Sequence, residues 1–320
     1  MFRLLSNTLL LGLMFALGCA SGEEIDTDVS PDQNANATST STGPTQPTNT
    51  TQPTNANGTQ CLQNLSSESV RHMRVKKLEI PTTAAEAAAL NCEISIGTNR
   101  GSGLSGLVSM LEFDLEALVS PDANGVIPSV LIASLDGWGA NMTDQDVGAL
   151  AFRIFGEAGQ SIHAPFSITD RATPVYDVPA SVNCEELSTG VGTFNLEVPL
   201  LNGQDSTPLA LEHAHLSGTL QTGTLEISRG TLNGYLTRAS LRGIIVGLQD
   251  ACRQGNAPEL CGADSPILTA DVDDMVDFAA TFLMGGFDST LTPQGLEACT
   301  GSNCNAVSVC IAFETESVSM

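Results

Sequence analysis

Two histidines two positions apart have the spacing that best fits a chemical role. His213 and His215 lie in segment 208–220, where apolar and polar residues alternate as in a β-strand. Alternate residues of a strand share a face, so both imidazoles would point the same way, as a metal pair requires, and Glu212 would point the other way. His163 or an acid could supply a third ligand. The alternative, two polar side chains on the solvent face of a sheet, needs no metal, and we expect no cofactor.

A glycine-rich hexapeptide and a run of acids each match a ligand-binding pattern incompletely. Residues 101–106 read Gly-x-Gly-x-x-Gly, the turn that brings a pyrophosphate to a helix N-terminus in dinucleotide-binding folds. No regular alternation of strands and helices follows, which favours a flexible turn. Asp271, Asp273, Asp274 and Asp277 fall at the start of a helical pattern, where acids cap the helix, whereas a calcium loop needs alternating ligands and a glycine.

The motifs of common hydrolases are missing from the sequence. Neither Gly-x-Ser-x-Gly nor His-Glu-x-x-His occurs. With 36 acidic residues, any two carboxylates could be proposed as a glycosidase pair, so their presence does not indicate a glycosidase. The sequence favours a protein that is not an enzyme without excluding an enzyme.

The charge balance argues against one class of partner. The chain has 36 Asp and Glu against 12 Lys and Arg, a net charge of −24 at pH 7. Binding to phosphates requires clustered basic residues, so a nucleic acid is not expected as a partner.

The N-terminus reads as an export signal. Arg3 precedes an apolar run, 4–17, that has the length of a signal-peptide core and is too short to span a membrane. The run ends Ala16-Leu17-Gly18-Cys19 and resembles the lipobox of bacterial lipoproteins. The resemblance implies that residues 1–18 are removed as a signal peptide. It also implies that Cys19 is acylated and anchors the protein in a lipid bilayer.

The residues after Cys19 bear on its destination. Ala20 and Ser21 stand where many such lipoproteins carry the aspartate that retains them in the inner membrane. The resemblance therefore implies an outer-membrane location, lipid-anchored on the periplasmic or cell-surface face. A plain signal peptide cut near Ala20, which would discard Cys19, is the alternative.

Residues 19–60 read as a disordered tether. From 33 to 60, Thr, Asn, Gln, Ser and Pro dominate, and no apolar residue is larger than alanine. Such a segment cannot bury enough apolar surface to offset the entropy of ordering. As a flexible coil it would span roughly 35 Å between its ends.

Eight further cysteines follow the tether. Exported domains keep disulfide bonds, and an even number favours four bridges of open connectivity. Short spacing favours a bridge between Cys252 and Cys261, and one of the clustered cysteines at 299, 304 and 310 is expected to bond outside the cluster. The disulfide candidates are Cys61, Cys92, Cys184, Cys252, Cys261, Cys299, Cys304 and Cys310.

The elements that must position these residues form one disulfide-linked domain, 61–320, with 256–320 as a candidate subdomain. Alternating patterns predict strands at 130–135, 149–155, 193–201, 208–220, 224–228 and 306–313. Helical patterns occur at 82–91, 104–119, 237–252 and 271–284, and 70–80 fits a strand or a short helix. The expected fold class is α+β, with a mostly antiparallel β-sheet and about four helices, stabilised by disulfides.

Two functions remain after these exclusions. We expect a membrane-anchored exported lipoprotein that displays a non-enzymatic binding or structural domain, with its ligand and envelope partner unidentified. The alternative is an exported hydrolase or metal-dependent enzyme that uses His213 and His215. A deep pocket that gathers the two histidines and buried acids would favour the enzyme.

Overall fold

The structure is a computed structural model that describes most of the chain beyond the tether. The described residues are 72–93, 101–106, 115–137, 150–169, 173–199, 206–221, 224–255, 261, 265–292, 295–299 and 303–320. All of them belong to one compact unit, Thr54–Met320. The predicted signal peptide (1–18), Cys19, the predicted tether (19–60) and Cys61 lie outside the described residues.

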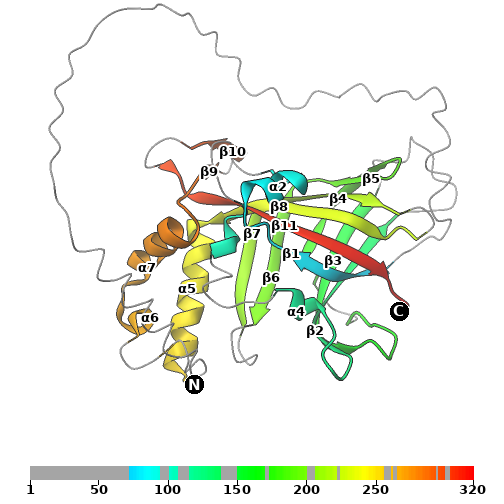
Figure 1. Cartoon of the computed structure of the whole chain (residues 1–320), viewed down its shortest axis with the longest axis horizontal. Helices are drawn as coiled ribbons and strands as arrows, with labels where there is room; N and C mark the ends of the chain where they lie inside the picture. The colour runs from blue at the N-terminus through cyan, green and yellow to red at the C-terminus, as the bar shows by residue number, and fades with distance from the viewer. Residues whose placement is uncertain are drawn as a thin grey trace, which may run out of the picture. The chain divides into compact units, whose positions relative to one another are not determined.

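Eight antiparallel strands close into a barrel (Figure 1). Each barrel strand pairs with the barrel strand that follows it in chain order, and the last, β11, pairs back onto the first, β1. A closed barrel has no free edge along its pairing direction, which protects the wall from pairing with another chain. The barrel strands are β1 (His72–Glu79), β2 (Val126–Asp136), β3 (Leu150–Ser161), β4 (Tyr176–Asn183), β5 (Glu186–Thr189), β7 (Ser206–Leu220), β8 (Ile227–Thr237) and β11 (Ala306–Ser317).

Three further strands extend the sheet. β6 (Gly192–Pro199) follows β5 after a bend, and the long strand β7 pairs with β6 through its first half and with β5 through its second half. β9 (Ser289–Thr292) and β10 (Gly295–Ala298) form a hairpin, and Ser289 of β9 pairs with Ala306 of β11.

The longer helices gather on one side of the barrel (Figure 1). α5 (Arg238–Arg253) begins directly after β8, where the Thr237 side chain caps it, and buries one apolar face. It packs against β7 and α7. The remaining helices are α2 (Ala84–Ala89), α4 (Leu115–Val119), α6 (Pro266–Thr269), α7 (Val272–Phe278) and the π-helix η2 (Ala279–Leu283).

The main hydrophobic core fills the barrel and continues under α5. Strand β4 alternates buried and exposed residues along its length, as expected for a wall with one apolar face. β8 and β11 are buried on both faces, because other parts of the chain cover their outer sides. A second, smaller cluster lies around Phe166, with Ile127, Val130 and Ile132 of β2.

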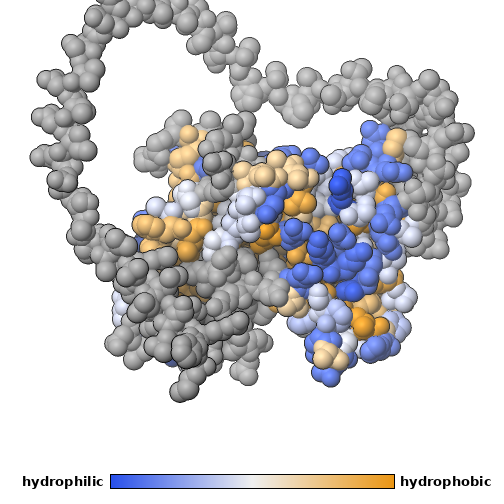
Figure 2. Space-filling view, in the orientation of Figure 1, coloured by the Kyte–Doolittle hydropathy of each residue, from blue (hydrophilic) through white to orange (hydrophobic). Residues whose placement is uncertain are grey.

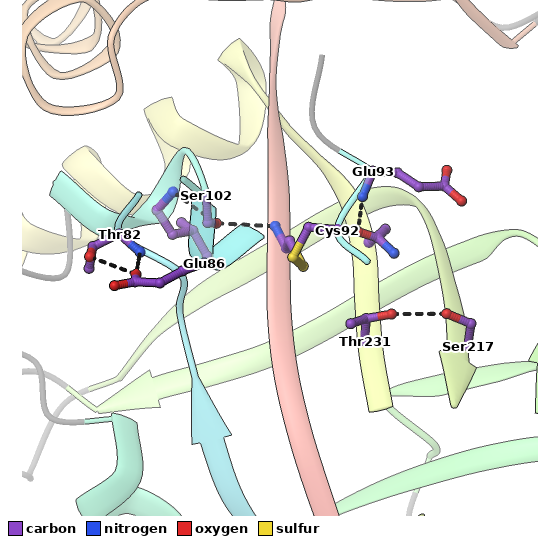
Figure 3. The surroundings of a disulfide bond; sticks show 10 residues. Thr82, Glu86, Cys92, Glu93, Ser102, Ser217 and Thr231 are labelled. Carbon is purple, nitrogen blue, oxygen red and sulfur yellow. Dashed lines mark hydrogen bonds between the residues drawn. A yellow bond between two sulfur atoms is a disulfide. The ribbon is translucent and has the colours of Figure 1, made fainter. Parts of the chain in front are cut away.

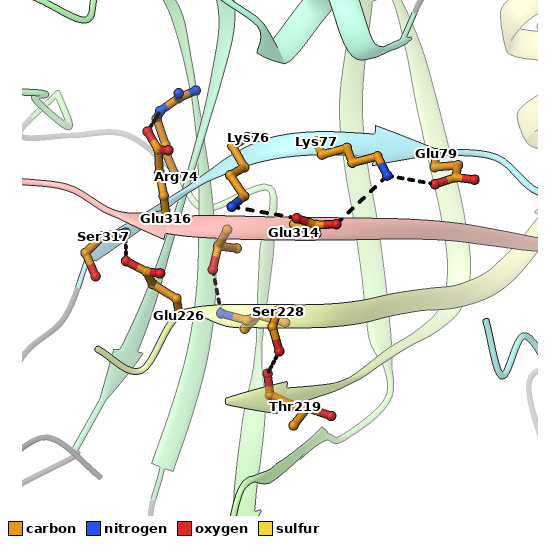
Figure 4. Close-up of polar contacts among 12 residues, drawn as sticks. Arg74, Lys76, Lys77, Glu79, Thr219, Glu226, Ser228, Glu314, Glu316 and Ser317 are labelled. Atoms are coloured by element: carbon orange, nitrogen blue, oxygen red, sulfur yellow. Dashed lines mark hydrogen bonds and ion pairs between the residues drawn. The ribbon is translucent and has the colours of Figure 1, made fainter. Parts of the chain in front are cut away.

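Ion pairs hold the seam where β1 and β11 close the barrel (Figure 4). Arg74 of β1 pairs with Glu316, and both Lys76 and Lys77 lie within 4 Å of Glu314. A bulge after Val75 lets both lysines reach the same carboxylate. Figure 2 shows hydrophilic residues over this face of the barrel.

The expected antiparallel sheet with disulfides is confirmed, whereas the α+β class is not. The sheet closes on itself, and its closure depends on strands from opposite ends of the domain. Strand β11, from the candidate subdomain 256–320, is part of the barrel.

Individual elements follow the sequence patterns unevenly. The helices at 82–91 and 237–252 are confirmed, with Thr83 and Thr237 as their N-caps. The open segment 70–80 is a strand, and β8 runs on to Thr237, well past the strand predicted at 224–228. Of the helix predicted at 104–119, the stretch 107–114 lies outside the described residues. The strands not predicted are β4, which contains Pro179, and β5, β9 and β10, which have four residues each.

Candidate functional site

A cavity lies within the main hydrophobic core of the barrel. Twelve side chains line it and all are apolar, contributed by β1, β2, β3, β6, β7, β8 and β11. The volume of the cavity is about 30 Å³. Cavities with a wholly apolar wall stay dry and are the kind that accepts small apolar molecules. We call it the lumen.

Alternation along the strands produces the lumen wall. Phe152 and Ile154 of β3 point inward two residues apart, as do Leu131 and Ala133 of the paired strand β2. Ala133 is the smallest side chain in the wall, so it leaves part of the space that a larger residue would fill.

Tyr176 fixes the corner where β5 continues into β6. Its hydroxyl lies 2.9 Å from Thr189 Oγ1, 3.2 Å from the Gly190 carbonyl and 3.1 Å from the Ala214 carbonyl. Its ring meets Phe194 of β6 edge to face, with centroids 6.1 Å apart. Burial raises the pKa of Tyr176 above its ordinary value. The corner therefore positions Phe194, which lines the lumen.

A β-bulge changes the expected relationship of the two histidines. Glu212 of β7 pairs with Tyr235 of β8, and His215 pairs with Asn233, so His213 and Ala214 together oppose one residue. His213 has φ 52°, in the left-handed region that a bulge imposes. Because Tyr235 and Asn233 share a face of β8, Glu212 and His215 share a face of β7, contrary to the opposite faces expected for these two residues.

The two histidines make separate contacts. His215 Nε2 lies 3.2 Å from a carboxylate oxygen of Glu93, whose side chain is largely exposed. The His213 ring meets the Tyr235 ring at a centroid distance of 6.3 Å. Among the residues that the structure describes, no group of three or more His, Cys, Asp or Glu side chains could hold a metal ion. His163 lies at the far end of β3, beside Gly125.

Tyr235 is a buried polar residue beside the bulge. Burial raises the pKa of its phenol, and the charges of Asp288 and Glu93 raise it further. The hydroxyl makes no hydrogen bond within the described part of the chain. Glu212, opposite Tyr235, accepts a hydrogen bond from Thr237 Oγ1 at 3.2 Å.

The glycine-rich hexapeptide packs against protein backbone instead of a ligand. Gly103 N donates to the Ser308 carbonyl of β11, and Ser102 Oγ accepts from Cys310 N (Figure 3). A Cβ on Gly103 would lie 2.0 Å from a methyl group of Val307, and one on Gly101 would lie 2.1 Å from a carbonyl oxygen of Pro81. These contacts cover the edge of β11 beyond its pairing with β1 and explain the glycines without a pyrophosphate.

The acids at 271–277 cap helix α7 and pair with basic residues of α5. Asp271 caps α7 by accepting from Asp273 N, Asp273 pairs with Arg242, and Asp277 pairs with Arg238. Arg238 holds the pKa of Asp277 below its ordinary value. Capping and ion pairing to α5 account for these three acids.

The disulfides bind distant parts of the fold together. Cys92 bonds to Cys310 of β11 across 218 residues (Figure 3), and Cys252 bonds to Cys261 across 9. A third bridge joins Cys299 to Cys304, and Cys184 is also disulfide-bonded. The predicted short bridge is confirmed, and Cys310 is the member of the cluster that bonds outside it.

Comparisons with known proteins add no assignment. No family model, curated protein or solved structure matches the chain. Of the helices that the structure describes, none combines the length and apolar character that a membrane span requires.

The lumen is the feature that sequence reasoning missed. Its lining residues come from seven strands, and only pairing in three dimensions shows that they face one another. The only sequence signal is the alternation of apolar residues in each strand, which indicates a buried face without showing whether the sheet is flat or closed.

Proposed function

We propose that the protein is an exported lipoprotein, anchored in the outer membrane through acylated Cys19, that displays a non-enzymatic binding domain whose ligand site is the barrel lumen. One observation carries the binding role: the side chains that line the lumen are all apolar. Small-molecule sites are concave and predominantly apolar, and eight-stranded barrels are wide enough to hold one small ligand. The anchor rests on the lipobox-like leader.

Xenon binding tests the ligand site, because xenon enters apolar cavities without needing a polar partner. Crystals of the chain under xenon pressure should show xenon in the lumen. Ala133→Leu should remove it by filling the space. The matched control is Ala88→Leu, at an exposed position of α2, which should leave xenon binding unchanged. A lumen without xenon in the unsubstituted protein would overturn the proposed site.

Metabolic labelling tests the anchor separately. Labelled palmitate should enter the wild-type chain and fractionate with the outer membrane, and Cys19→Ala should abolish the labelling. Label that persists in the Cys19→Ala variant would contradict acylation at this residue.

The second candidate, an exported hydrolase or metal-dependent enzyme, has the contact between His215 and Glu93 as its supporting observation. It predicts bound metal in the purified protein that is lost in His213→Ala and His215→Ala. Metal content that both substitutions leave unchanged would dispose of this candidate.

A further inference from the structure

We infer that the lumen selects wholly apolar molecules and rejects analogues of the same shape that carry a hydroxyl or carboxylate group. This inference rests on the proposed function, because it specifies the ligand chemistry of the same cavity. It follows from the hydrogen bonds and ion pairs that the polar groups around the lumen already make.

Two buried hydroxyls on strands of the barrel, those of Thr315 and Tyr176, already have hydrogen-bond partners. Thr315 of β11 has the same strand parity as Ile311 and Phe313, which line the cavity. Its hydroxyl accepts from Ile227 N at 2.7 Å and donates to the sulfur of Met73 at 3.6 Å. The Tyr176 hydroxyl is occupied by the β5–β6 corner. A ligand hydroxyl in the lumen would therefore give up water without gaining a partner.

The basic side chains of β1, one of the lumen strands, already lie beside carboxylates. Arg74, on β1, donates to Glu316 at 2.6 Å and to the Val119 carbonyl at 3.1 Å. Lys76 and Lys77 lie beside Glu314, as Figure 4 shows. In a chain of net charge −24, an anionic headgroup at this seam would compete with carboxylates already in place.

Benzene, phenol and benzoate make the test because they share one ring and differ in one substituent. The full chain is used with Cys19→Ser, so that no acyl chain competes for the lumen. Binding is measured by the shift in melting temperature and by NMR titration in sealed samples. Leaving a buried hydroxyl unpaired costs about 1–3 kcal/mol, so benzene should bind about 5- to 150-fold more tightly than phenol. Benzoate should not bind.

A cavity-enlarging variant separates size from chemistry. Leu216→Ala adds room at the wall and should strengthen benzene binding while keeping the preference over phenol. Ala133→Leu should abolish benzene binding, and Ala88→Leu should leave it unchanged.

The outcomes distinguish the selectivity of the lumen from its role as a ligand site. Phenol or benzoate binding as tightly as benzene in the lumen would overturn the inferred selectivity and leave the lumen as a ligand site. Absence of xenon from the lumen of the unsubstituted protein would overturn the lumen site itself. Failure of benzene to bind both the Cys19→Ser chain and its Leu216→Ala derivative would overturn the inferred ligand chemistry.

Discussion

Arg74 on the first barrel strand lies 2.6 Å from the carboxylate of Glu316 on the last. The side chain of Arg74 is 9% exposed, and its guanidinium also donates to the Val119 carbonyl and lies 5.9 Å from the centre of the Phe166 ring. This one side chain connects the closing strands, helix α4 and the smaller hydrophobic cluster.

Replacing Arg74 should therefore weaken barrel closure. Arg74→Met leaves the buried Val119 carbonyl unpaired and should lower the free energy of unfolding by about 2–3 kcal/mol. Arg242→Met is the control, because Arg242 and its partner Asp273 are both more than half exposed. It should cost less than about 1 kcal/mol. Urea denaturation of both variants measures the difference, and equal losses would contradict the role assigned to Arg74.

Gly103 should not tolerate a side chain, because its Cβ would lie 2.0 Å from Val307 and 2.8 Å from the Ser308 carbonyl. Gly103→Ala should destabilise the protein by about 1–3 kcal/mol. Gly243 on α5 has open space around it, so Gly243→Ala should stabilise the helix by about 0.5–1 kcal/mol. Opposite signs in thermal unfolding are the expected result, and a neutral Gly103→Ala would mean that the hexapeptide does not pack on β11.

The two tyrosines of the chain should respond differently to loss of the hydroxyl. Tyr176→Phe leaves the partners of a buried hydroxyl unsatisfied and should cost about 1–3 kcal/mol. Tyr235→Phe should change stability by less than about 0.5 kcal/mol, because within the described residues its hydroxyl has no hydrogen bond to lose. The pKa values of both tyrosines are raised in the folded protein. The stability that each neutral phenol contributes is therefore complete below the ordinary tyrosine pKa and is lost as the pH rises through the raised pKa. Chemical denaturation at neutral pH compares the variants.

The partner of Cys184 should be Cys61. Cys184 is disulfide-bonded, and the three described bridges use the other six cysteines predicted to form disulfides. Acylation would remove Cys19 from the possible partners. Non-reducing peptide mapping by mass spectrometry should find a peptide that links residues 61 and 184. A link between Cys184 and Cys19 would contradict both this pairing and the lipid anchor.

The turn before β2 should make stability depend on pH at the acid end. Asp122 accepts hydrogen bonds from the backbone N–H groups of Val126 and Asn124, each at 2.8 Å, and these bonds hold its pKa below the ordinary value. The stability that the ionised Asp122 carboxylate contributes is therefore complete above the ordinary carboxyl pKa, and it is lost as the pH falls through the lowered pKa of Asp122. The urea midpoints of the wild type and Asp122→Asn should differ more at pH 6 than at pH 2. An equal difference at both values would contradict the prediction.

Local residue chemistry allowed several elements to be predicted. Thr83 and Thr237 mark the starts of two helices because a side-chain oxygen can satisfy an unpaired backbone N–H wherever a helix begins. The short bridge between Cys252 and Cys261 follows from proximity along the chain. β4 was missed because Pro179 argues against a strand locally, whereas its pairing with β3 and β5 is a tertiary matter.

By itself, the sequence determined the acidic charge, the lipobox-like leader, the even set of cysteines after the tether and the alternating strands, since each depends on residues close together in the chain. The tertiary structure alone decided the closure of β1 onto β11, the apolar lumen and the bulge that brings Glu212 onto the face of His215. Strand pairing over long sequence distances produces these features. A one-residue bulge changes which side chains share a face, and the spacing of the residues in the sequence does not reveal it.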